Sequence, residues 1–270
     1  MSAYALPILY ALFVWWFSTG LILYLDRLPR HTFRWSLLGA TVFMGTGLYG
    51  LAVSGADATV AGAYTGFTCA LLVWAWHEVS FLMGFVTGTR TTPCPPDARG
   101  WQRFVAATQA ILWHELAILA SAVLVVTLTW GAANQVGTWT FLLLWLMRLS
   151  TKLNLFLGVP NLAEGLLPDH LRYLASFLAR RPMNLLFPVS VTLSTVVAGL
   201  FVQNALAAEA VAFEVAAFTF LAALTTLAVL EHWFLVLPLP VEALWAWSLR
   251  QSGAKPPLPE PSLARLVVTR

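Results

Sequence analysis

Seven stretches of almost uninterrupted apolar residues alternate with short polar segments along this chain. Each stretch is close to the roughly 20 residues that an α-helix needs to cross the hydrocarbon core of a bilayer. The pattern predicts an all-α fold, a polytopic integral membrane helical bundle with about seven transmembrane helices. The predicted spans cover about Tyr4–Leu25, Trp35–Val53, Val60–Gly84, Phe104–Trp130, Thr138–Leu157, Leu185–Leu206 and Val211–Leu237.

The basic residues occupy every second connection between these spans. Of the fifteen lysines and arginines, all but Arg148 and Lys152 lie in the first, third and fifth connections or in the C-terminal tail. Cytoplasmic loops of membrane proteins are enriched in Lys and Arg, so this distribution predicts a periplasmic N-terminus and a cytoplasmic C-terminus.

The chain is expected to form one transmembrane domain over residues 1–250, followed by a proline-rich, flexible cytoplasmic tail over residues 251–270. The longest cytoplasmic loop, about 159–184, contains apolar residues at helical spacing after Pro168, which predicts a short amphipathic helix at the membrane surface.

Composition agrees with this class of protein. Hydrophobic residues make up 59% of the 270 residues and charged residues only 10%, against about 25% charged residues in soluble domains. The basic residues behind the net charge of +3 are distributed as membrane topology requires. This distribution predicts contact with the lipid bilayer and no nucleic-acid partner. The sequence contains no nucleotide-binding glycine loop, nucleophile elbow or HExxH motif.

Ionisable residues interrupt four of the predicted spans. The fifth span carries Arg148, Lys152 and Asn154, and a charge inside a bilayer is retained only where it faces the protein interior and finds a partner. Three other spans each carry an adjacent His/Glu pair: His77 with Glu78, His114 with Glu115, and Glu231 with His232. At 1.5 Å per residue, these groups are expected to share a slab roughly 8 to 15 Å below the cytoplasmic surface.

This expected layer has three interpretations. Imidazole and carboxylate side chains suit a transition metal (Fe, Zn or Mn), with His77, His114, His232, Glu78, Glu115 and Glu231 as candidate ligands. A neutral histidine inside a span can also bind the magnesium of a bacteriochlorophyll-type pigment. In either case Arg148, Lys152 and Asn154 would bind the cofactor or balance its charge. The third interpretation is a set of polar contacts that hold the helices together without chemistry.

Several segments resemble a known family. Residues 9–20 (LYALFVWWFSTG), 137–141 (GTWTF), 148–154 (RLSTKLN), 181–188 (RPMNLLFP) and 230–238 (LEHWFLVLP) are similar to the PuhE-type photosynthetic complex assembly proteins of purple phototrophic bacteria. The resemblance implies a multi-pass protein of the bacterial inner (intracytoplasmic) membrane. It also implies reaction-centre or core-antenna subunits as partners and a link to bacteriochlorophyll supply. The family has no established catalytic residues to transfer to this chain.

Two functions follow from these observations. The first is an assembly factor for the photosynthetic reaction centre and core light-harvesting complex that also handles bacteriochlorophyll. The alternative is a His/Glu metal-dependent membrane enzyme that acts on a lipophilic pigment precursor or isoprenoid.

Overall fold

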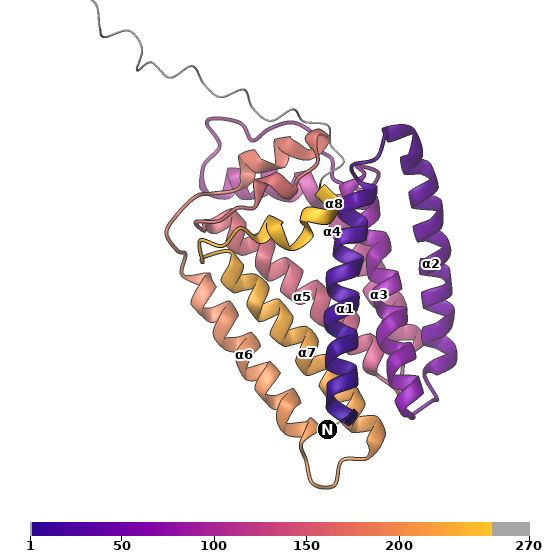
Figure 1. Ribbon diagram of the computed structural model, residues 1–270. Coiled ribbons are helices and arrows are strands. Elements are labelled where there is room, and N and C mark those ends of the chain that lie inside the picture. Colours follow the sequence, from indigo (N-terminus) through magenta and orange to yellow (C-terminus); the bar gives the residue numbers. More distant parts are fainter. Residues whose placement is uncertain (1, 250–270) are drawn as a thin grey trace, which may run out of the picture.

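The structure is a computed structural model that describes residues 2–249, in which seven long helices stand side by side (Figure 1). The described part of the chain contains no β-strand, only an isolated bridge between Val159 and Arg180. The all-α expectation is therefore confirmed. The long helices are α1 (Ser2–Leu25), α2 (Phe33–Ser54), α3 (Val60–Leu82), α4 (Gly100–Leu128), α5 (Val136–Leu157), α6 (Leu186–Ala205) and α7 (Ala212–Phe234).

Six of these helices are long and apolar enough to cross a membrane; α3 is the exception. Helix α3 packs against α1, α2, α5 and α7, and its buried residues outnumber those of every other described helix. A helix surrounded by other helices meets little lipid, so it can carry polar groups such as His77 and Glu78. A seventh span over α3 stays a prediction.

Successive connections between the long helices lie at alternating ends of the bundle. The N-terminus lies at the end opposite the α1–α2, α3–α4 and α5–α6 connections (Figure 1). We call the end with these three connections the basic end because they contain Arg27, Arg30, Arg90, Arg172 and Arg180. The positive-inside rule predicts that the basic end faces the cytoplasm.

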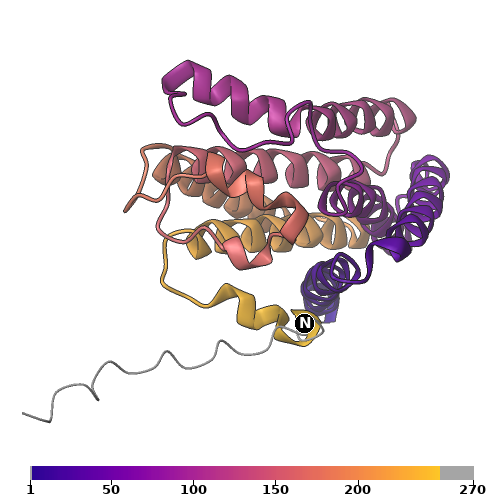
Figure 2. The ribbon, with the colours of Figure 1, turned by 90° about the horizontal axis from the view of Figure 1, so that it is seen from above.

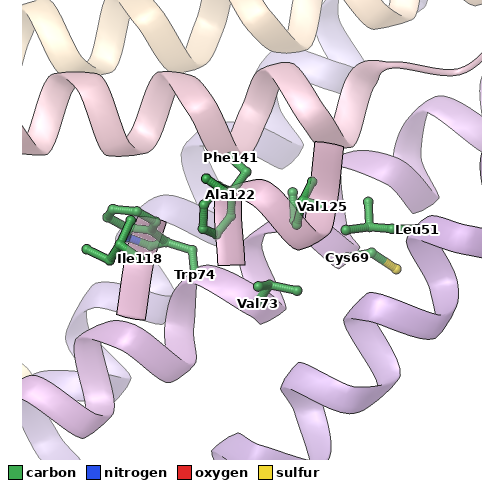
Figure 3. Close-up of a cluster of buried hydrophobic side chains, with 9 residues drawn as sticks. Leu51, Cys69, Val73, Trp74, Ile118, Ala122, Val125 and Phe141 are labelled. Carbon is green, nitrogen blue, oxygen red and sulfur yellow. The ribbon is translucent and has the colours of Figure 1, made fainter. Parts of the chain in front are cut away.

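The core lies where α2, α3, α4 and α5 meet. Leu51, Val73, Ile118 and Phe141, one from each helix, belong to one buried cluster (Figure 3). Helices α2 and α3 approach closely because Gly47 has no side chain. A Cβ atom at this position would lie 2.7 Å from the backbone oxygen of Cys69.

Short helical turns cover the basic end. They are η1 (Arg30–Thr32), η2 (Glu164–Leu166), η3 (Asp169–Phe177), η4 (Val241–Trp245) and α8 (Ala246–Leu249). The segment after Pro168, expected to form a short amphipathic helix at the membrane surface, is the 3-10 helix η3. Its Leu171, Leu174 and Phe177 are buried in a cluster with residues of α3 and α4, so this apolar face packs on the bundle.

The chain after α7 returns to α1. Trp245 packs edge to face on Trp15 with ring centroids 5.6 Å apart, and Trp247 packs on Trp16. The α7 boundary differs from the prediction, because the helix ends at Phe234 rather than near Leu237. The last helical turn therefore contains Glu231 and His232. The proline-rich tail predicted for residues 251–270 lies outside the described residues.

Candidate functional site

Helix α5 supplies two cations to the interior of the bundle. Nη2 of Arg148 donates to Oε2 of Glu78 on α3 at 2.9 Å, and Nζ of Lys152 donates to Oε1 of Glu115 on α4 at 2.5 Å. Arg148 and Lys152 are four residues apart and therefore lie on one face of α5. The two ion pairs connect α5 to α3 and α4, as expected for charges retained inside a membrane protein.

The third carboxylate has a different partner. Oε1 of Glu231 accepts a hydrogen bond of 2.7 Å from Nε1 of Trp15, which links α7 to α1. No ion pair among the described residues includes Glu231. The set of Glu78, Glu115, Glu231, Arg148 and Lys152 thus has one carboxylate more than it has cations.

His77 and His114 form a buried pair between α3 and α4. Their ring centroids are 6.4 Å apart, and the residues are 0% and 1% exposed. Within residues 2–249, neither ring nitrogen of His77 has a hydrogen-bond partner, and Nδ1 of His114 also lacks one. Phe81 packs on the His114 ring at 4.4 Å, and Trp76 packs edge to face on His77 at 5.1 Å. A buried polar atom without a partner costs about 1–3 kcal/mol, so this pair is retained at a cost to stability.

His232 belongs to a separate network with α5 and α6. Its Nε2 lies 2.9 Å from Oγ of Ser150, and its Nδ1 lies 2.8 Å from the backbone oxygen of Ala228. Ser150 donates to Ser190 of α6 at 2.9 Å, and Asn154 donates to the same serine at 3.2 Å. His232 and the buried Asn154 therefore join three helices by hydrogen bonds.

The six candidate metal ligands are not gathered at one point. In the described part of the chain, no group of three or more His, Cys, Asp and Glu side chains is arranged to hold a metal ion. Glu78 and Glu115 accept hydrogen bonds from the two cations, and Glu231 accepts one from Trp15. Metal ligation by all six residues would require these contacts to break. It stays a prediction, as does pigment ligation by the enclosed His77 and His114.

Sequence reasoning missed several residues of this region. Trp15, Ser150 and Ser190 complete the polar contacts, yet tryptophan and serine are common in membrane helices and gave no separate signal. Ser150 lies between Arg148 and Lys152, and this position in a polar segment could have indicated that it takes part in the polar contacts.

Asp26 is a further buried carboxyl group, and it lies just outside the long helices. Asp26 directly follows α1, is 4% exposed, and has no hydrogen-bond partner for either carboxylate oxygen among the described residues. Burial raises the pKa of Asp26 to about 7, although the neighbouring charge of Arg27 acts in the opposite direction.

Comparison with known proteins gives two matches. Residues 1–255 match the model of a family described as protein of unknown function (DUF3623). The chain is also 41% identical over 242 residues to a Rhodobacter capsulatus protein named "Uncharacterized 30.4 kDa protein in puhA 5'region", and the alignment covers 88% of each chain. No solved structure gives a significant match. The family description does not carry the PuhE-type name that the sequence resemblance implied, and the name of the relative refers to the 5′ region of puhA.

Proposed function

We propose that this chain, which belongs to the DUF3623 family, is an assembly factor for the bacterial photosynthetic reaction centre and its core light-harvesting complex. The Rhodobacter capsulatus relative supports this proposal because its name places it in the 5′ region of puhA, a photosynthesis gene region. The site of action is the bacterial inner (intracytoplasmic) membrane, and the partners are reaction-centre or core-antenna subunits.

The observation that carries the proposal is the incomplete enclosure of Arg148. Its side chain is 41% exposed, whereas its partner Glu78 is 12% exposed. Arg148 lies nine residues before the end of α5, or about 14 Å along the helix axis. At such a depth lipid tails offer no hydrogen-bond acceptors, and charged residues normally face protein or water.

A partner helix can complete the contacts of this guanidinium. Arginine has five N–H donors, and among the described residues only Nη2 of Arg148 makes a hydrogen bond. An incoming subunit helix with a polar or acidic side chain at the same depth would satisfy the remaining donors. The Arg148–Glu78 pair would stay in place when that helix binds and when it leaves, so the contact is reversible, as an assembly factor requires.

Handling of bacteriochlorophyll is a second part of this proposal. His77 and His114 retain ring nitrogens without partners, which is the chemistry of an axial ligand to magnesium. Both rings are enclosed, so access for a macrocycle requires α3 and α4 to separate at the basic end. The arrangement does not favour the metal-dependent enzyme, because hydrogen-bonded partners occupy all three glutamates.

The test is replacement of the gene in a phototrophic host by Arg148→Gln, with Arg34→Gln as a matched control at the start of α2. We expect Arg148→Gln to lower the amount of assembled core complex at unchanged levels of the variant protein and of total pigment precursors. The control should leave the core complex unchanged. Accumulation of one discrete pigment precursor would instead support the enzyme, and a normal core complex in a gene deletion would refute the assembly role.

A further inference from the structure

The α3–α4 connection, residues 83–99, lies directly against α4 (Figure 2). The backbone N–H of His114 donates to the oxygen of Thr87 at 2.9 Å, and the N–H of Arg90 donates to the oxygen of Gln109 at 3.2 Å. Gly88 lies between these contacts, where a Cβ atom would lie 2.0 Å from the oxygen of Gln109. Only glycine permits this approach, so the segment holds Arg90 at one position along α4.

A groove of about 410 Å³ opens beside this contact. Its lining includes Arg90, Pro95, Asp97, Trp101, Gln102 and Gln109. Nη1 of Arg90 donates to Oγ1 of Thr92 and to the oxygen of Pro93, and the other guanidinium nitrogens of Arg90 have no hydrogen bond within residues 2–249. Neither Arg90 nor Asp97 takes part in an ion pair in that part of the chain. As far as the described residues go, the groove thus presents one unpaired cation and one unpaired anion.

The position of the groove matches the headgroup layer of a membrane. With 29 residues, α4 is about 43 Å long, whereas the hydrocarbon core is about 30 Å thick. The surplus length allows the first turns of α4 to reach the interface. There Trp101 is 74% exposed, as interfacial tryptophans are. Further along α4 the exposed large side chains are apolar, including Trp113, Leu116 and Leu119.

We propose that this groove binds the headgroup of a phospholipid that carries a phosphate and a primary ammonium group, as phosphatidylethanolamine does. Arg90 pairs with the phosphate and Asp97 with the ammonium group, while the acyl chains lie on the apolar face of α4 below Trp101. This match of both charges favours a zwitterionic headgroup over an anionic one, which would leave Asp97 facing a negative lipid. The proposal does not depend on the role in complex assembly.

The test is native mass spectrometry of the full chain after exchange into nanodiscs of phosphatidylethanolamine, phosphatidylglycerol and phosphatidylcholine in equal parts. We expect the wild-type protein to retain phosphatidylethanolamine preferentially. Arg90→Gln should lower that retention about tenfold, the loss typical of a hydrogen bond to a charged group. Asp97→Asn should retain phospholipid but lose the preference for phosphatidylethanolamine over the other two.

Arg34→Gln is the matched control, because Arg34 lies at the basic end outside the groove. An equal loss of lipid in Arg34→Gln, or unchanged retention in Arg90→Gln, would refute the proposal. A wild-type preference for phosphatidylglycerol would also overturn it. If Arg90→Gln does not fold, Asp97→Asn still decides the question, since unchanged selectivity in that variant contradicts the assignment.

Discussion

Arg148 of α5 and Glu78 of α3 form an ion pair 2.9 Å long inside the helical bundle, yet the arginine is more than three times as exposed as the glutamate. The pair therefore contributes to helix packing and still leaves a guanidinium that a second molecule can reach. Both properties can be measured separately.

We expect Arg148→Met to lower the free energy of unfolding in detergent micelles by about 1–3 kcal/mol. This range lies between the values for surface pairs and fully buried pairs, because Glu78 loses its partner while Arg148 is partly exposed. The double variant with Glu78→Met should recover part of the loss, since no unpaired charge remains. A double-mutant cycle of denaturant unfolding measures this coupling, and strict additivity of the two losses would show that the pair makes no net contribution.

The two kinds of buried histidine should respond differently to the same substitution. His77→Leu is expected to leave the unfolding free energy unchanged or to raise it, because His77 has two buried nitrogens without hydrogen-bond partners in the described structure.

His232→Leu, the matched comparison, should destabilise by about 1–3 kcal/mol because Ser150 loses its contact with the imidazole. The free energies of unfolding of both variants, measured in the same detergent, test this difference. If His77→Leu proved the more damaging, the His77 ring would have to make polar contacts that the structure does not contain among residues 2–249.

Gly88→Ala should destabilise the protein by about 1–3 kcal/mol or more, because the new methyl group would meet the backbone oxygen of Gln109. Gly39→Ala on α2 is the control, since a Cβ atom at Gly39 meets nothing within 4 Å. In a helix interior that change is expected to stabilise by about 0.5–1 kcal/mol. Melting temperatures measured side by side should therefore move in opposite directions, and a shared direction would contradict the close contact at Gly88.

Stability should depend on pH through Asp26, whose folded-state pKa is raised from 3.8 to about 7 by burial. The folded protein binds the proton more tightly than the unfolded chain, so this contribution is fully present below about pH 4. The contribution of Asp26 to stability declines as pH rises from about 4 to about 7 and is lost above pH 7.

Asp26→Asn should flatten this part of the pH profile of the melting temperature and melt higher than wild type at pH 8. The control Asp169→Asn changes an exposed carboxylate and should retain the wild-type slope. A profile of Asp26→Asn that parallels wild type would assign the dependence to another group.

The sequence alone determined the helical elements. The apolar runs predicted all seven long helices, and the α1 and α5 boundaries agree within two residues, because hydrophobic length is a local property of the chain. The charged and polar residues of those runs could be recognised for the same reason. The predicted boundaries of α4 and α7 were less accurate. Helix α4 begins at Gly100 and α7 ends at Phe234, and both positions depend on how the neighbouring connections pack.

Only the tertiary structure decided which polar groups meet. It paired Arg148 with Glu78, joined Glu231 to Trp15 of α1, and separated His232 from the other two histidines. Helical periodicity sets the direction of a side chain around its own axis, but the order and rotation of seven helices result from packing over the whole bundle. For that reason three similar His/Glu pairs lie in three different surroundings, and among the described residues only His77 and His114 pack ring against ring, edge to face.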